Sequence, residues 1–86
     1  MYKSKINISI RKTILDPQGK AVEHSLQSLG FSGIKDTRIG KYIELLIDAK
    51  SAEEAGEISR KACEKLLANP VMEDYSIIIT EIKEEN

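Results

Sequence analysis

Hydrophobic and polar residues alternate near the start of the chain. Tyr2 and three isoleucines fall on one side of the segment Tyr2–Arg11, while lysine, asparagine and serine fall on the other. This period of two predicts a strand with one buried face. The segment Tyr75–Ile82 also predicts a strand, but it carries apolar residues on both of its faces.

Two segments between these strands have helical spacing. Asp16-Pro17 predicts the start of the first helix, since aspartate caps free N–H groups and proline lacks one. Gly30 predicts its end. The second helix starts at the capping box Ser51 to Glu54 and ends at Asn69-Pro70. The predicted buried stripes are Val22, Leu26 and Leu29 in the first helix, and Ala55, Ile58, Ala62 and Leu66 in the second.

The middle segment, Ile34–Asp48, is predicted to form a hairpin that turns at Gly40-Lys41. Together with the flanking elements it gives the order β-α-β-β-α-β, which is typical of ferredoxin-like domains. We therefore expect an α+β fold, with a mainly antiparallel four-stranded sheet and two helices on one face. The length of 86 residues fits a single domain, 1–86, with a frayed tail at 83–86.

The apolar residues on both faces of the last two predicted strands indicate an assembly. Two helices cover one face of a sheet, so the other face would expose a patch, and such patches usually mark interfaces. The patch would contain Tyr42 and Leu46, with either Ile78 and Ile82 or Tyr75 and Ile77 beside them. We expect a homodimer or tetramer. The alternative is a last strand that bends over the core and buries both of its faces.

Composition narrows the classes of partner. The net charge is −1 with 31% charged residues, so neither nucleic acid nor an acidic membrane is suggested as a partner. The N-terminus has no run of signal-peptide length, and no segment is long enough to span a bilayer. The single cysteine, Cys63, excludes an internal disulfide and fits a reduced, cytoplasmic setting.

The search for catalytic chemistry identifies no centre. His24 has no orienting partner or nucleophile signalled near it, and we interpret it as a surface residue. Cys63 lies among basic residues, a setting that lowers a thiol pKa, but helical cysteines are more often packing residues. The glycine spacings match no phosphate-binding loop. We expect no catalytic, cofactor-binding or metal-binding residue in this chain.

Three loops carry residues that the fold itself does not require. Gln18 and Gly19 follow the helix start. Glycine weakens a helix, so Gly19 suggests either that another segment approaches the backbone closely there or that the first turn is irregular. Arg38 and Lys41 place two cations at the predicted hairpin tip, where they would contact an acidic partner or protect a sheet edge. An acidic pair follows the proline turn of the third loop.

These loops resemble the PurS family. The resemblance is carried, in order, by the runs ILDPQGKAVEHSLQSLGF, RIGKYIEL and CEKLLANPVMEDY, and it extends from about Ile6 to Tyr75. It implies the small, non-catalytic subunit of a multi-chain phosphoribosylformylglycinamidine synthase, which makes formylglycinamidine ribonucleotide from formylglycinamide ribonucleotide. The implied partners are a glutaminase subunit (PurQ) and a large synthetase subunit (PurL). These partners use glutamine and ATP with Mg, while this chain would bridge them and assist ammonia transfer.

The resemblance also implies which residues make subunit contacts. The matching positions are Asp16, Pro17, Gln18 and Gly19 in the first loop, Arg38, Gly40 and Lys41 in the second, and Asn69, Pro70, Glu73, Asp74 and Tyr75 in the third.

Three other classes share the expected fold. An ACT-like module would bind an amino acid at a dimer interface, and the fold cannot distinguish it from a complex subunit. RNA binding would need exposed aromatic residues on the central strands, and the chain is poor in these. An acylphosphatase would need an arginine-lined phosphate loop after the first strand, and Arg11, Lys12 and Thr13 resemble such a loop only weakly.

Overall fold

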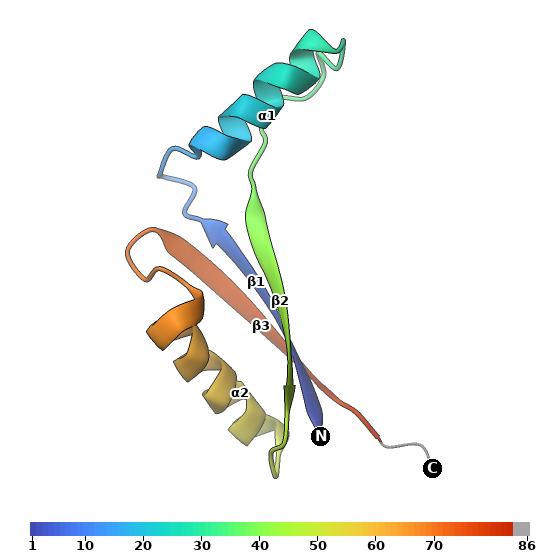
Figure 1. Ribbon diagram of the computed structural model, residues 1–86, viewed down its shortest axis with the longest axis vertical. Helices are drawn as coiled ribbons and strands as arrows, with labels where there is room; N and C mark the ends of the chain where they lie inside the picture. The colour runs from blue at the N-terminus through green and yellow to red at the C-terminus, as the bar shows by residue number, and fades with distance from the viewer. Residues whose placement is uncertain (84–86) are drawn as a thin grey trace.

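The computed structural model describes residues 1–83, and Figure 1 shows their arrangement. The elements are β1 (Tyr2–Ile10), α1 (Pro17–Ser28), β2 (Gly40–Ile47), α2 (Ala52–Ala62), a π-helical turn η1 (Cys63–Leu67) and β3 (Glu73–Glu81). Both helices start at the predicted caps. The Asp16 carboxylate accepts a hydrogen bond from the Gly19 N–H, and the Ser51 hydroxyl accepts one from the Glu54 N–H. Gly30 has a φ of 101° just beyond α1, as its stop signal predicts.

Within residues 1–83 the sheet has three strands in the order β2-β1-β3, and both pairs are antiparallel. Ile6 in the central strand lies opposite Ile43 on one side and Ile77 on the other. β2 and β3 therefore run in the same direction with β1 between them. The connection through α2 must pass across β1, which is the split β-α-β arrangement.

The predicted hairpin and fourth strand are wrong. Residues 34–39 form no strand, and Gly40 is the first residue of β2 rather than part of a turn. One cause is that the Ile39 N–H donates to the Asp16 carboxylate at 2.8 Å, so it is not free for a strand ladder. Gly40 is needed where β2 meets β1, because a Cβ atom there would overlap the Ile8 carbonyl oxygen. The α+β class is confirmed, with the element order β-α-β-α-β.

The core lies between α2 and the sheet. Its buried apolar members are Ile6 and Ile8 of β1 together with Cys63 and Ala68. The buried stripe consists of Ala55 and Ser59 of α2 and Cys63 of η1, all with small side chains, which allow the helix to lie close to the sheet. The hydroxyls of Ser59 and Ser4 are hydrogen-bonded at 2.7 Å, so both polar groups are satisfied in the core.

Part of the predicted stripe in α2 is therefore wrong. Ala55 is fully buried, but Ile58 is 42% exposed and Leu66 is 83% exposed. The prediction assumed that the helix buries its largest apolar residues against its own sheet. Instead the small residues face the sheet, and the larger ones lie on the flank of the helix.

The expectation that both helices cover one face is also wrong. α2 lies on the sheet, but α1 lies beyond one end of it (Figure 1). Gly19 is the only buried residue of α1, and Leu29, just after the helix, is 74% exposed. The radius of gyration is 16.8 Å, whereas a compact chain of this length has about 12 Å. The molecule is elongated because α1 does not fold back.

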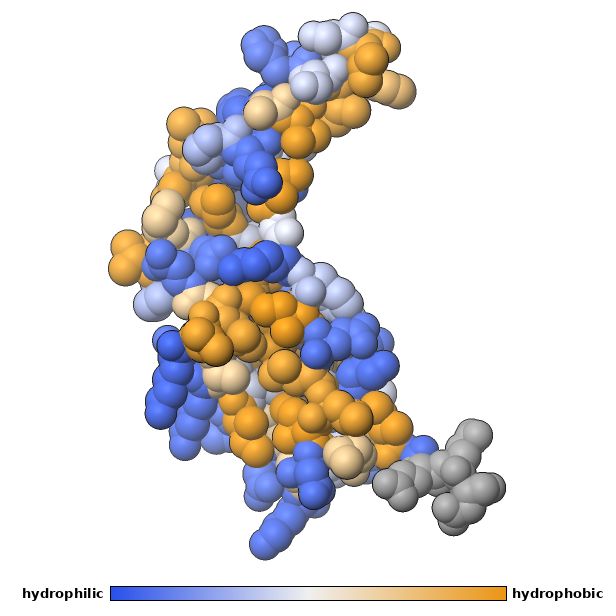
Figure 2. Space-filling view, viewed as in Figure 1, coloured by the Kyte–Doolittle hydropathy of each residue, from blue (hydrophilic) through white to orange (hydrophobic). Residues whose placement is uncertain are grey.

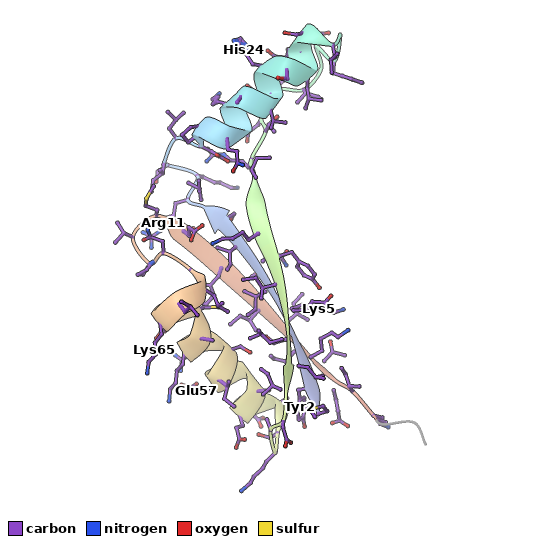
Figure 3. The ribbon with its side chains drawn as sticks, in the orientation of Figure 1. Tyr2, Lys5, Arg11, His24, Glu57 and Lys65 are labelled. Carbon is purple, nitrogen blue, oxygen red and sulfur yellow. The ribbon has the colours of Figure 1, made fainter. Side chains whose placement is uncertain are left out.

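The sheet face opposite α2 is open. Lys5, on the central strand, points to this side in Figure 3 and lies between Glu44 and Ile78 in the register. Tyr42 and Leu46 lie on the same face of β2, so polar residues of β1 separate them from Ile78. The predicted contiguous patch is therefore two apolar margins with a polar centre.

The exposure of β3 also decides whether the last strand buries both of its faces. Ile78 is 57% exposed, so β3 does not bury both of its faces within the described chain. Ile82 lies just past β3, half-buried, and its N–H donates to the Met1 carbonyl oxygen at 2.9 Å. Of the predicted frayed tail, residues 84–86 lie outside the described residues.

Candidate subunit-contact site

The three loops singled out in the sequence meet at one end of the sheet. They are residues 15–19, which run into the first turn of α1, residues 38–41, which lead into the start of β2, and residues 68–75, which run from the end of η1 into the start of β3. Figure 1 shows all three at the end of the sheet from which α1 projects. The resemblance grouped them by sequence order, and the fold now brings them together in space.

Asp16 joins two of these loops. Its carboxylate accepts hydrogen bonds from the Gly19 N–H at 3.0 Å and from the Ile39 N–H at 2.8 Å. Only 3% of the residue is exposed. The two backbone donors, in that order, hold the pKa of the carboxyl below its usual value, and the Arg38 guanidinium adds to this effect. Asp16 therefore fixes the start of α1 to the segment entering β2, and Pro17 is the first residue of that helix.

Gly19 fulfils the prediction of a close backbone approach. A Cβ atom at this position would overlap the Thr37 carbonyl oxygen and lie 2.7 Å from a carboxylate oxygen of Asp16. Its neighbour Gln18 is exposed on the first turn of α1. Gly19 thus belongs to the contact between the start of α1 and the segment entering β2, whereas Gln18 is exposed at the surface.

Arg38 also stabilises the loop that leads into α1. Its guanidinium donates hydrogen bonds to the carbonyl oxygens of Lys12 at 2.9 Å and Ile14 at 3.0 Å. Its Nε atom lies 3.8 Å from the Asp36 carboxylate. The planar, multiply donating guanidinium suits this role, since one side chain serves several carbonyl groups of the loop. We call the set Asp16, Gly19 and Arg38, with their backbone partners, the α1 clamp.

The third loop is a turn held by its own side chains. The Asn69 side chain accepts from the Val71 N–H at 2.9 Å, and the Asn69 N–H donates to the Glu73 carboxylate at 2.8 Å. These bonds fix the backbone on both sides of Pro70. The π-helical turn ends just before Asn69, at Leu67, with Ala68 as the C-cap whose N–H donates to the Cys63 carbonyl oxygen.

Two cations tie this third loop to the sheet. Arg11 donates to the Pro70 carbonyl oxygen at 2.8 Å and lies 3.2 Å from the Asp74 carboxylate (Figure 3). Lys41 lies 3.8 Å from the Glu73 carboxylate. Sequence reasoning missed the role of Arg11, because the pairing of β1 with β3 that brings it to Asp74 is not visible in the sequence.

Two other predicted contact residues have places within the sheet. Gly40 pairs with Ser9 at the start of β2, and Tyr75 lies opposite Ile8 in β3. Tyr75 is half-buried and packs against the core. Both residues therefore lie in paired positions of the sheet, next to the loops.

Among residues 1–83, no group of three or more His, Cys, Asp or Glu is arranged to hold a metal ion. Cys63 is fully buried, and burial raises the pKa of its thiol, which disfavours the reactive thiolate. His24 lies on the outer side of α1 (Figure 3). None of the helices in this part of the chain is long and apolar enough to cross a membrane.

Comparisons with known proteins agree with the resemblance. A family model described as PurS, phosphoribosylformylglycinamidine (FGAM) synthase, matches residues 3–81. The PurS subunit of phosphoribosylformylglycinamidine synthase from Bacillus subtilis (strain 168) is 46% identical over 82 residues, which cover 95% of this chain and 96% of the relative. The corresponding subunit from Methanocaldococcus jannaschii is 35% identical over 83 residues, which cover 96% and 100%.

Solved structures extend this agreement to the fold. Bacillus subtilis PurS matches with a TM-score of 0.86 and 47% identity, over 94% of this chain and 100% of that chain. A chain in the structure of PurLQS from Thermotoga maritima matches with a TM-score of 0.84 and 38% identity, over 92% and 96%. The family model and these relatives together show that the chain belongs to the PurS family, the subunits of phosphoribosylformylglycinamidine synthase in purine biosynthesis.

Proposed function

We propose that this chain is a non-catalytic subunit that bridges a glutaminase subunit and a synthetase subunit and assists ammonia transfer between them. The observation that carries the proposal is the match to a chain of the Thermotoga maritima PurLQS structure, at a TM-score of 0.84. A bridging role also agrees with the site, which is a group of polar loops held by hydrogen bonds from their own side chains. In this proposal ATP with Mg and glutamine are used by the partner subunits.

The exposed parts of the three loops would make the subunit contacts. Gln18, Lys41 and Asp74 carry polar groups at the surface, while the α1 clamp and the Asn69 turn hold the backbone beneath them. A preorganised loop loses little conformational freedom on binding, which favours affinity. Asp16, Gly19 and Arg38 thus contribute to contact by fixing the loops.

The proposal includes a homo-oligomer in a cytoplasmic setting. The radius of gyration of 16.8 Å and the exposed apolar residues of α1 support self-association. The unpaired, buried Cys63 fits a reducing compartment.

The deciding experiment measures amidine formation by purified synthetase and glutaminase subunits, with and without this chain. One series uses glutamine as nitrogen donor and the other uses ammonium salt. We expect glutamine-driven turnover to require the chain and ammonium-driven turnover to continue without it. If neither rate changes when the chain is omitted, the bridging role is wrong, and screening for an amino-acid ligand as in an ACT-like module becomes the next step.

A further inference from the structure

Several polar side chains of the three loops are bonded within the chain. Arg38 donates to carbonyl oxygens of the loop that leads into α1, and only 3% of Asp16 is exposed. The Glu73 carboxylate accepts from the Asn69 N–H at 2.8 Å, and 17% of its side chain is exposed. These groups have found their partners inside the protein and hold the backbone. Other side chains of the loops are left to meet a partner subunit.

Three large apolar side chains of the same loops are exposed. Val71 is 74% exposed, Leu15 is 66% exposed and Met72 is 42% exposed. We call these three residues the loop tip. Figure 2 shows apolar side chains at the left edge of the molecule, where the first and third loops lie in Figure 1. Single exposed apolar residues are ordinary, but a group of them on adjoining loops indicates a contact surface.

The two loops that carry the tip are bonded to each other through Arg11. Its N–H donates to the Met72 carbonyl oxygen at 2.9 Å, and its guanidinium donates to the Pro70 carbonyl oxygen at 2.8 Å. Its own carbonyl oxygen accepts from the Ile14 N–H at 2.9 Å, one residue before Leu15. Arg11 therefore holds the backbone next to each residue of the loop tip.

The Asn69 turn fixes the tip of the third loop as well. The Asn69 side chain accepts from the Val71 N–H at 2.9 Å and from the Met72 N–H at 3.4 Å. Apolar side chains on a backbone held in this way lose little more than their own rotamer freedom on burial, so the tip is preorganised for binding. Methionine adapts its shape to a neighbouring surface and is enriched in the cores of interfaces.

The charge beside the loop tip is positive. The nearby acidic groups are paired within the chain, Asp74 with Arg11 and Glu73 with Lys41. Lys12 is exposed, and no ion pair of residues 1–83 includes it. A surface that buries the tip would therefore be complementary if it carried a carboxylate opposite Lys12.

We propose that the loop tip anchors this chain to the synthetase subunit by inserting into an apolar recess bordered by a carboxylate. This rests on the proposed function, and it adds the surface and the partner. A standard interface has roughly 20–30 residues on each side, so the tip forms its apolar centre and the polar residues around it form the rim. Recesses are found preferentially at domain boundaries, which assigns the tip to the larger of the two partner subunits.

The first test measures how much of each variant supports half-maximal glutamine-driven amidine formation by the assembled subunits. Val71→Glu and Leu15→Glu should each raise this concentration about a hundredfold, since a carboxylate would be buried without a partner. Val71→Ile keeps the tip apolar and should leave the concentration unchanged, and ammonium-driven turnover should be the same with every variant. An unchanged concentration in both charged variants would show that the tip is not part of the contact.

Leu29→Glu is the matched control for contact between copies. Leu29 and Val71 are both 74% exposed, but Leu29 lies at the far end of α1, among the apolar residues that support self-association. Leu29→Glu should lower the mass measured by light scattering, whereas Val71→Glu should keep the mass of the unaltered chain. Circular dichroism confirms that both variants are folded. A lower mass in Val71→Glu would assign the tip to a second copy and overturn the proposal.

Lys12 tests the charge beside the tip. Lys12→Glu should slow association with the other subunits and weaken its dependence on salt, whereas Lys12→Arg should behave as the unaltered chain does. The onset of glutamine-driven turnover after mixing, followed at several salt concentrations, reports the association rate. Lys65→Glu makes the same change on the outer side of α2 (Figure 3) and should have no effect. Equal effects of the two glutamate variants would contradict a carboxylate opposite Lys12.

A crosslink identifies the partner. Val71→Cys gives the chain one accessible thiol, because its single natural cysteine, Cys63, is fully buried. The variant is labelled with a thiol-reactive photo-crosslinker and then assembled with both subunits, glutamine and ATP with Mg. We expect the crosslink on the synthetase subunit, where mass spectrometry locates it. A crosslink to the glutaminase subunit or to a second copy would overturn the assignment.

Omission of the chain separates this inference from the bridging role. If glutamine-driven turnover requires the chain but is insensitive to Val71→Glu and Leu15→Glu, the bridging role stands and the loop tip is wrong. If turnover does not require the chain, the bridging role itself is wrong. The crosslink then still shows whether the loop tip meets the synthetase subunit.

Discussion

A single carboxylate fixes how the long helix leaves the sheet. Asp16 accepts one hydrogen bond from the first turn of α1 and one from the residue before β2. The usual view of an N-capping aspartate is local, because it satisfies N–H groups of its own helix. Here the same side chain also joins two segments that are 23 residues apart in sequence.

Asp16→Asn should destabilise the chain. The amide has one oxygen where the carboxylate uses two, so one buried N–H group loses its acceptor at a cost of about 1–3 kcal/mol. Urea unfolding of the variant and the wild type gives the difference, with the exposed Asp48→Asn as control. The folded pKa of Asp16 is lowered, so its stabilisation is complete above the ordinary value of about 3.9 and is lost as the pH falls through the lower folded value. The two unfolding midpoints should therefore converge in strong acid; a constant difference would contradict this account.

Gly19→Ala tests the other half of the α1 clamp. The added methyl group would overlap the Thr37 carbonyl oxygen, which must move, and overpacking of this kind costs about 1–3 kcal/mol. Gly33→Ala is the matched control, because no atom lies within 4 Å of its Cβ position. Thermal unfolding should separate the two variants, and equal melting temperatures would show that the clamp is not rigid.

At the scale of elements, the predictions from sequence succeeded where the deciding chemistry is local. Asp16-Pro17 and the capping box at Ser51 are confirmed as helix starts, and the alternation in β1 is confirmed as its buried face. The failures lie where distant groups decide. Residues 34–39 form no strand, and the Ile39 N–H among them is bound by Asp16, 23 residues earlier in the chain. Ile58, predicted to be buried in the second helix, is 42% exposed.

The candidate site shows the same division. Its three loops were found from their sequences, and the function of Gly19 as a point of close approach was predicted. The part played by Arg11 was not, since it depends on the register of β1 with β3. That register follows from the whole sheet, and no local pattern encodes it.

The stability of α1 should depend on contact with a second copy of the chain. A helix of 12 residues is marginal in water by itself, and glycine in its first turn weakens it further. In the self-associating protein we expect slow hydrogen exchange in α1, and in the Leu29→Glu variant we expect fast exchange there. β1 should keep its protection in both. Equal exchange of α1 in the two proteins would mean that the helix does not need a second copy.

At the scale of the whole molecule, shape distinguishes a chain with α1 extended from one with α1 folded back onto its own sheet. A monomer with α1 extended has a radius of gyration near 16.8 Å, whereas one with α1 on its own sheet would be near 12 Å. Small-angle scattering of the Leu29→Glu variant, once monomeric, should give the larger value. The smaller value would show that α1 returns to its own sheet when no second copy is present.

The order of the strands also determines how the chain can be made. β1 ends at Ile10, but its two neighbours begin only at Gly40 and Glu73, and within residues 1–83 no two strands are joined by a tight turn. The strand synthesised first therefore keeps one edge unpaired until β2 has been made, and the other until β3 follows near the end of the chain. Contacts between such distant segments are slow to form, which favours folding in milliseconds to seconds. Lys3 and Lys5 on that strand are well suited to this interval, because exposed charges on an unpaired edge discourage aggregation.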